Sequence, residues 1–227
     1  MRNLLSILLI MVACSGFGQT QPSAEYHFNG NSNDAMGLNN GTDHTISYVQ
    51  GIENSAASFN GSGWVSITGT PTEFNLSGAM TIAAWLNTTT VAAGMKCWIS
   101  SADNSSQQQY ELELNRTAGK ITIVWGNAIV ATSTGSLTAN TWYDVVVTRS
   151  GSSGNWTCNI YINGVLDKST TSISTNPSSI QTVTIGTAGG GGGKWNGMID
   201  GLKIYKAAMS VAEIKNRYGF GTGKMFH

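Results

Sequence analysis

Charged residues are scarce in this chain. Of its 227 residues only 12 are basic and 12 are acidic, 11% in all, and the formal net charge is zero. A soluble domain usually has about 25% charged residues, so Ser, Thr, Asn, Gln and Gly must cover much of this surface. Nucleic-acid binding needs clustered cations to neutralise phosphates, and docking on an anionic membrane needs them too. The composition therefore excludes binding driven by bulk charge and leaves neutral, hydroxyl-rich partners open.

Proline is rare as well, with 3 residues, whereas glycine is abundant, with 28. No helical periodicity of any length occurs before the end of the chain. Instead, short runs typical of β-strands alternate with turns rich in Gly, Ser, Asn and Thr. Many short strands at this spacing predict an all-β sandwich or barrel, and two packed antiparallel sheets fit the pattern. The predicted strands are residues 24–28, 56–59, 64–68, 80–87, 97–100, 110–114, 120–125, 142–149, 157–162, 182–185 and 198–205.

Alternation within these runs indicates which side chains face the core. In the run 157–163, Cys158, Ile160 and Ile162 share one face. Three consecutive valines at 145–147 predict a strand that is covered on both faces. Asn163-Gly164 favours a tight hairpin turn, because this dipeptide accepts positive φ values.

Only one helix is predicted, over residues 211–218. Ser210 and Glu213 form a capping box at its start, and Gly219 stands where a C-terminal cap is expected. The five glycines at 189–193 predict a flexible loop inside the domain, since strand signals continue on both sides.

The first 18 residues are predicted to be a signal peptide. One basic residue precedes the apolar stretch Leu4–Val12, and small residues follow it. Cleavage after Gly18 would leave a single domain of residues 19–227. Alternatively, Met11-Val12-Ala13-Cys14 resembles a bacterial lipobox, which would anchor the protein through a lipid on Cys14. Either alternative predicts a secreted, extracellular or periplasmic protein, and no later segment of the sequence is long enough to be a transmembrane helix.

Two cysteines, Cys97 and Cys158, follow the signal peptide. In an oxidising compartment an even number of cysteines is consistent with a disulfide, but a domain of this size does not need one. Two buried free thiols are the alternative.

Several segments, taken in order, resemble the laminin G-like jelly roll of the concanavalin A-like lectin/glucanase superfamily. The resemblance covers residues 24–219 and implies the two-sheet antiparallel jelly-roll sandwich, with the short C-terminal helix. One departure is Gly201, where the family usually has Glu. The matching segments are 26–34, 57–67, 80–86, 141–148, 160–166, 195–205 and 208–214, among them Met80-Thr81-Ile82-Ala83-Ala84-Trp85-Leu86 and Asn196-Gly197-Met198-Ile199-Asp200.

Glucanases of this superfamily carry their acid and nucleophile as Glu-x-Asp-x-Glu on one strand, and the nearest pattern here is Glu111-Leu112-Glu113-Leu114-Asn115. Side chains two residues apart share a strand face at about 7 Å, a spacing that suits acid/base work. Asn115 replaces the third carboxylate, however, and such alternation is common in a strand with a polar solvent face. The sequence also lacks a Gly-x-Ser-x-Gly elbow and zinc-ligand spacing. We therefore predict that the chain is not an enzyme.

Asp200 alternates with Met198, Leu202 and Ile204, which predicts that a carboxylate points toward the core. A buried charge must be paired, hydrogen-bonded or bound to a metal. Jelly rolls similar to this one often hold a calcium ion where the first and last strands meet. A structural Ca²⁺ site is therefore one prediction, and hydrogen bonds from backbone N–H groups of the loop 31–34 are the alternative. The predicted ligands are Asp34, Asn33, Gly30 and Asp200.

Exposed aromatic rings stack on the apolar faces of sugars. The family uses aromatic residues for packing at the positions of Trp64, Trp85, Trp142, Tyr161 and Trp195. Trp156, Trp98 and Trp125 fall outside those positions, so they are the predicted ligand platforms. Trp156 follows a Gly/Ser turn and is the preferred candidate, whereas Trp125 closes an apolar strand face that favours burial.

These observations predict an exported, non-catalytic module that binds carbohydrate or a cell-surface or extracellular partner. A structural or adhesive spacer without a small ligand is the alternative. A divergent polysaccharide hydrolase using Glu111 and Glu113 is a third hypothesis.

Overall fold

The computed structural model describes residues 20–69, 71–104 and 107–223. The predicted signal peptide, its cleavage site and the predicted lipid anchor at Cys14 lie outside these residues.

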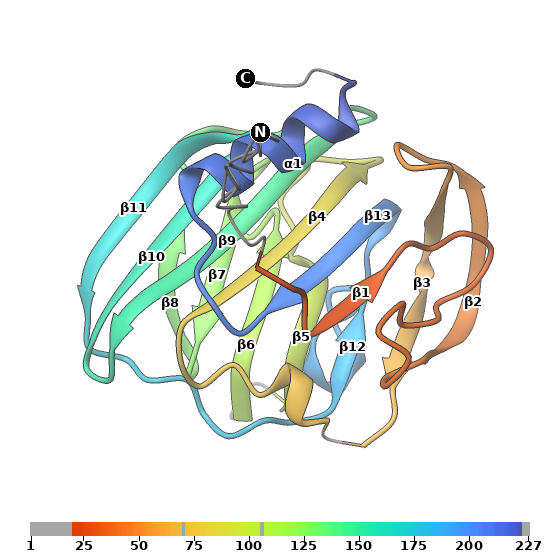
Figure 1. Cartoon of the computed structure of the whole chain (residues 1–227). Coiled ribbons are helices and arrows are strands. Elements are labelled where there is room, and N and C mark those ends of the chain that lie inside the picture. The colour runs from red at the N-terminus through yellow and green to blue at the C-terminus, as the bar shows by residue number, and fades with distance from the viewer. Residues whose placement is uncertain (1–19, 70, 105–106, 224–227) are drawn as a thin grey trace, which may run out of the picture.

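The described chain forms two packed layers of antiparallel strands (Figure 1). The first layer has the strand order β11 (Val165–Ile173), β10 (Asn155–Ile162), β9 (Tyr143–Ser152), β4 (Met80–Thr88), β13 (Asn196–Tyr205) and β1 (Ala24–Tyr26). The second layer has the order β12 (Val183–Ile185), β5 (Lys96–Asn104), β6 (Gln107–Leu114), β7 (Ile121–Trp125) and β8 (Ala128–Thr132). This is the predicted jelly-roll sandwich.

A single long strand, β3 (Ser55–Ile67), joins the two layers. Residues 57–60 of β3 pair with β13, and residues 65–67 pair with β12. β2 (Gly41–Gln50) pairs with β3 along both parts. The sequence predicted two strands, 56–59 and 64–68, where the structure has one. The polar residues 60–63 between them interrupt the apolar signal and form a bulge in the pairing with β2, but they do not end the strand.

The core between the layers is built by the alternation that the sequence shows. Cys158 and Ile160 face it, as do Val145 and Val147. The opposite face of the same strands packs on helix α1 (Val211–Gly221), where Val146 contacts Ile214 in a second apolar cluster. The prediction that the valine strand is covered on both faces is confirmed.

Helix α1 begins as predicted and ends later. The Ser210 hydroxyl accepts the Glu213 N–H at 3.3 Å, and the Glu213 carboxylate accepts the Ser210 N–H at 2.7 Å. The helix continues past Gly219 to Gly221, so the predicted C-terminal cap is wrong. Gly221 lies against the Trp85 ring, where a Cβ would come within 2.3 Å of the indole. Close packing, rather than capping, therefore explains a glycine at the end of this helix.

Three strands were missing from the prediction: β2, β8 and β11. All lie at sheet edges, and β2 and β11 carry mostly polar, partly exposed side chains, so they lack an apolar period. The predicted hairpin turn at Asn163-Gly164 has φ values of 52° and 74°. Within the described residues no helix is long and apolar enough to span a membrane. The shorter 3₁₀ turns are η1 (Thr72–Phe74) and η2 (Gly189–Gly191).

Trp125 and Trp156 enclose a buried arginine. The Arg149 guanidinium lies 4.8 Å from the Trp125 ring centroid and 4.9 Å from that of Trp156, and it donates to the Leu76 and Gly78 carbonyls. Burial lowers the pKa of Arg149 to about 10. Trp156 is only 5% exposed, and Trp98 and Trp125 are fully buried. The prediction that these three tryptophans are ligand platforms is therefore wrong, because each ring is used in packing.

Cys97 and Cys158 are free thiols, not a disulfide. Cys158 faces the core between the layers. Cys97 pairs with Glu113 across β5 and β6, on the outer face of the other layer, and its thiol donates to the Ile99 carbonyl at 3.2 Å. The two side chains thus lie on different faces of different layers.

We expect Trp156→Ala to lower the free energy of unfolding by about 3–5 kcal/mol, the usual cost of deleting a buried aromatic side chain. The change also removes one ring from Arg149. Urea unfolding measures the effect, and Trp142→Ala, at a partly exposed tryptophan, is the control with a smaller loss. A loss below 1 kcal/mol would contradict the packing role of Trp156.

Candidate functional site

The four predicted calcium ligands do not converge in the structure. Asp34 is buried, and its carboxylate accepts the backbone N–H groups of Glu25 at 2.9 Å, Met36 at 3.0 Å and Asn39 at 3.2 Å. Gly30 and Asn33 are exposed in the loop beside it. These donors already occupy the Asp34 oxygens, so the carboxylate closes its own loop rather than facing a cation.

Asp200 belongs to a different network. Its carboxylate accepts the backbone N–H groups of Ile52 at 2.8 Å and Glu53 at 2.9 Å. A register shift between Asp200 and Lys203, with Gly201 at φ 53°, breaks the alternation of β13. As a result Ile199 and Leu202 both face the core, and Asp200 does not, contrary to the sequence prediction.

The hydrogen-bonded alternative for Asp200 is therefore what the structure has, although the donors come from residues 52–53 rather than 31–34. Within the described residues no group of three or more His, Cys, Asp or Glu side chains could hold a metal. The four residues thus do not fit a shared Ca²⁺ site, and calcium binding stays a prediction.

A groove opens on the outer side of the second layer, over β3, β12 and the end of β5. Its volume is about 340 Å³, at the small end of the range of about 300–1,000 Å³ usual for ligand pockets. We call it the Trp64 groove. It is lined by Trp64, Ala102, Asp103, Thr182, Thr184, Thr187, Ala188, Gly189–Gly191 and Lys194.

Threonines line the floor of the groove, and a network of hydroxyl groups, including that of the buried Ser100, lies beneath it. Thr184 pairs with Ser66 on one side and Ser100 on the other. The Ser100 and Thr184 hydroxyls lie 3.0 Å apart, and the Thr184 hydroxyl donates to the Thr187 carbonyl at 2.9 Å. The outward side chains at this level are Ser66 of β3, Thr184 of β12 and Ser100 of β5. All three are hydroxyl side chains, so the outer face here is polar and neutral.

One wall is the glycine segment 189–193, which lies over β5. A Cβ on Gly189 would come within 2.6 Å of the Ala102 Cβ, so only glycine allows this close approach. The segment is tied down by Gly189 N–H, which donates to the Glu111 carboxylate at 3.0 Å, and by Cys97 N–H, which donates to the Gly193 carbonyl at 2.7 Å. The predicted loop is therefore anchored at both ends of the glycine run.

The opposite wall is the partly exposed indole of Trp64. It stacks on His44, with ring centroids 4.4 Å apart and planes 12° from parallel. The His44 ring is itself hydrogen-bonded to the Ser66 hydroxyl at 2.9 Å. The Lys194 ammonium lies 3.8 Å from the Trp64 ring centroid. Trp64 is thus supported by the stacked His44 ring and contacted by the long side chain of Lys194.

Trp64 was missed as a site residue, although its signal is in the sequence. In Trp64-Val65-Ser66-Ile67, Val65 and Ile67 are buried in the core, so Trp64 and Ser66 face outward. The resemblance to the family instead assigned Trp64 to a packing position.

The Glu111–Glu113 pair lies beneath the glycine segment. Glu113 is fully buried and is bound by Arg116 through both carboxylate oxygens at 2.7 Å. Glu111, 2% exposed, accepts from Gly189 and, at 2.7 Å, from Gln108. The strand was predicted to face solvent, but both carboxylates are covered and already paired. That arrangement gives no support to the hydrolase hypothesis.

Burial raises the pKa of Glu111 to about 7, and the neighbouring Glu113 charge adds to this effect, while the Gly189 N–H opposes it. The Glu111 carboxyl therefore exchanges its proton near neutral pH.

Comparison with protein-family models identifies the family of this chain. A laminin G family model, described as the concanavalin A-like lectin/glucanases superfamily, matches residues 59–215. The chain belongs to this superfamily. No curated protein matches the chain.

Members of the fold with solved structures include domain 4 of AbnA, an extracellular arabinanase of Geobacillus stearothermophilus, in complex with arabinotriose. It is 17% identical with a TM-score of 0.70, and the match covers 87% of this chain and 98% of that domain. The receptor-binding domain of botulinum neurotoxin type G is 17% identical with a TM-score of 0.66, covering 88% of this chain and 51% of that one. The binding domain of botulinum neurotoxin DC, in complex with rat synaptotagmin II, is 15% identical with a TM-score of 0.65, covering 87% and 51%. These likenesses show the superfamily fold, and the chain spans about half of each toxin domain.

The raised pKa of Glu111 predicts a pH-dependent stability. The folded state holds the Glu111 proton up to about pH 7, whereas the unfolded state releases it near 4.5. The folded state thus binds more protons in this window, so stability falls as pH rises from about 4.5 to about 7 and is then constant. The slope from one group is at most about 1.4 kcal/mol per pH unit.

Urea unfolding at pH 5 and pH 7 measures this effect against Glu111→Gln, which keeps an acceptor for Gly189. We expect the variant to lose part of the decline between the two values. The same decline in both proteins would contradict the assignment to Glu111.

Proposed function

We propose that the Trp64 groove binds a neutral oligosaccharide and that the chain is an exported carbohydrate-binding module without catalytic activity of its own. The observation that carries this proposal is the rigid, partly exposed Trp64 indole opposite hydroxyl groups and glycine backbone. Indole faces stack on the C–H faces of sugars, and hydroxyl and peptide groups exchange hydrogen bonds with sugar hydroxyls.

The charge of the groove supports a neutral ligand. Asp103 and Lys194 are the charged residues in its lining, one of each sign. Asp103 also accepts the Thr182 N–H at 3.2 Å, which fixes it at the rim. An acidic polysaccharide would gain little from such a groove, and the chain as a whole has no net charge.

A sugar ring that stacks on Trp64 displaces the Lys194 ammonium. At an exposed site a cation–π contact contributes only about 0.5–1 kcal/mol, so the exchange costs little. Lys194 then lies free at the groove edge, where its ammonium can donate to a sugar hydroxyl.

The AbnA domain supports a glycan over a protein partner, because nearly its whole length matches this chain and it was solved with arabinotriose. The toxin domains match over half their length. An arabinan is therefore the first polysaccharide to test, beside a neutral β-glucan and an acidic pectin.

We expect the protein to be retarded in a native gel cast with a neutral polysaccharide, and Trp64→Ala to migrate as in a gel without it. Lys194→Met should stay retarded, because the stacking surface remains. Phe220→Ala, at an exposed aromatic of α1 outside the groove, is the control and should behave as the parent protein.

Retention of full retardation by Trp64→Ala, with its urea midpoint unchanged, would contradict the groove as the binding site. Absence of retardation by every polysaccharide would overturn the glycan hypothesis for those sugars. The alternative of a structural or adhesive spacer would then be favoured, above all if the protein self-associates.

A further inference from the structure

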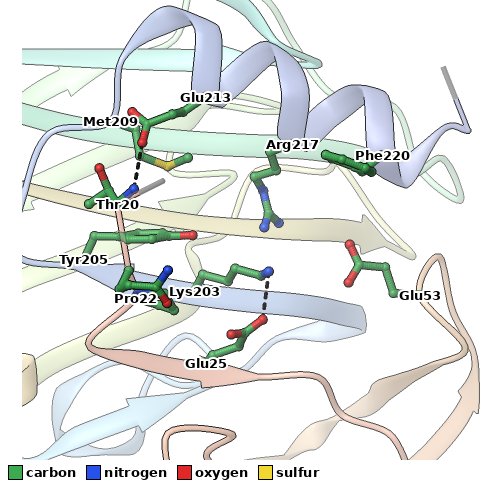
Figure 2. A pocket seen from close by; sticks show the side chains of 11 residues that line it. Thr20, Pro22, Glu25, Glu53, Lys203, Tyr205, Met209, Glu213, Arg217 and Phe220 are labelled. Carbon is green, nitrogen blue, oxygen red and sulfur yellow. Dashed lines mark hydrogen bonds and ion pairs between the residues drawn. The ribbon is translucent and has the colours of Figure 1, made fainter. Parts of the chain in front are cut away.

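A second cavity, with a volume of about 440 Å³, lies between α1, β1 and β13, away from the Trp64 groove (Figure 2). Most of its charged residues are paired within the fold. Lys203 and Glu25 form an ion pair at 2.7 Å, and Arg217 donates to the Asp144 carboxylate at 2.8 Å. We therefore assign no ligand to this cavity.

The glycine wall of the Trp64 groove, in contrast, rests on a buried titratable group. Glu111 does not line the groove, but its Oε1 accepts the N–H of Gly189 at 3.0 Å, and Gly189 does line it. The Glu111 Oε2 accepts the side-chain amide of Gln108 at 2.7 Å. A change in the charge of Glu111 therefore reaches the groove through one hydrogen bond.

The other hydrogen bonds of the glycine segment join neutral groups. The Gly192 carbonyl, for example, accepts the Ala188 N–H at 2.9 Å and the Thr187 hydroxyl at 2.9 Å. A hydrogen bond to an ionised acceptor is roughly twice as strong as one between neutral groups. Among the bonds that the described residues make with this segment, the bond to Glu111 is thus the one whose strength changes with pH.

Three charged or titratable side chains face Glu111. Glu113, on the same face of β6, is bound by Arg116, and this hydrogen bond raises the pKa of Arg116, which stays a cation. On β5, burial and then the charges of Glu111 and Glu113 raise the pKa of the Cys97 thiol, which stays neutral. On the other side of Glu111, β7 places Val124 opposite it, and neither β7 nor the glycine segment has a titratable side chain.

The hydrogen bond from Gly189 favours the ionised form of Glu111. Burial raises the pKa of Glu111 to about 7, and the Gly189 N–H acts in the opposite direction. Because such coupling is reciprocal, ionised Glu111 holds Gly189 more firmly than protonated Glu111 does. A proton on either oxygen would also face a donor, since Gly189 and Gln108 already bind both oxygens.

We propose that Glu111 is a positioning residue for glycan binding: its ionised carboxylate fixes the glycine wall of the Trp64 groove, so the affinity for a neutral oligosaccharide rises as the pH rises through neutrality. The inference rests on the function proposed for the groove. An oligosaccharide that contacts the peptide groups of Gly189–Gly191 binds best to a wall that is already fixed, because no binding free energy is then used to order it. Binding consequently favours the ionised form and releases part of a proton near neutral pH.

The response of the wall is tested first without a ligand, by an NMR pH titration of the ¹⁵N-labelled protein. We expect the Gly189 amide resonance to shift with an inflection near pH 7. Glu111→Gln keeps an acceptor for Gly189 but cannot ionise, so the inflection should be absent from this variant. Its absence from the parent protein, or its full persistence in Glu111→Gln, would overturn the proposal.

The coupling to binding is tested by isothermal titration with arabinotriose, and with a trisaccharide of a neutral β-glucan, at pH 5.5 and pH 8.5. We expect the parent protein to bind about fivefold more tightly at pH 8.5, from the usual difference between charged and neutral hydrogen bonds. Glu111→Gln resembles the protonated form, so at both pH values it should bind as the parent protein does at pH 5.5. A merely structural role of Glu111 would instead weaken binding by the variant at both pH values.

Three control variants remove the other titratable groups at the groove: His44→Phe, which keeps a ring against Trp64, Asp103→Asn and Lys194→Met. Each should keep the fivefold pH dependence, whatever its affinity. Equal pH dependence in the parent protein and Glu111→Gln, or loss of the dependence in a control variant, would overturn this inference and leave glycan binding by the groove in place. Absence of binding of both trisaccharides at both pH values would overturn the proposed function for these sugars and the inference with it.

Discussion

The hydrogen bond from the Gly189 N–H to the buried Glu111 carboxylate holds the glycine segment over the outer face of the second layer. An acidic side chain on an interior strand would be costly if it were left without a partner. Glu111 has donors from Gly189 and Gln108, and its burial raises its pKa to about 7. The segment that satisfies this carboxylate is also a wall of the Trp64 groove. The hydrogen bond between Gly189 and Glu111 thus stabilises a buried carboxylate and also positions one wall of the Trp64 groove.

The two outer faces of the sandwich are consequently different. On the first layer, α1 covers the sheet through an apolar cluster of Ala83, Val146, Tyr161 and Ile214. On the second layer, hydroxyl groups and a glycine segment lie over the strands and leave a neutral groove. A second cavity lies under the helix and is lined by charged residues of both signs. The neutral groove and the charged cavity therefore lie on separate sides of the fold.

Local sequence patterns predicted the sandwich, the hairpin turn and the start of α1, because strand alternation, an Asn-Gly turn and a capping box are short-range signals. The sites were not predicted, since they depend on contacts distant in sequence. Trp156 was predicted to be exposed because it follows a Gly/Ser turn, but Arg149 on the neighbouring strand packs against its ring. Asp200 was assigned to the core because nothing in the sequence marks the bulge at Gly201. Trp64 was also missed, because the resemblance to the family assigned it to packing, although the alternation of buried Val65 and Ile67 places it on the outer face.

Recognition of a neutral glycan by the Trp64 groove can be tested by an NMR titration of the ¹⁵N-labelled protein. The titrant is a set of oligosaccharide fragments of the polysaccharide that retards the protein. We expect shifts of the Trp64 indole N–H and of the backbone amides of Asp103, Thr184 and Gly189–Gly191, with α1 unaffected. Shifts that cluster elsewhere, or a saturating ligand that leaves the glycine segment unperturbed, would contradict it.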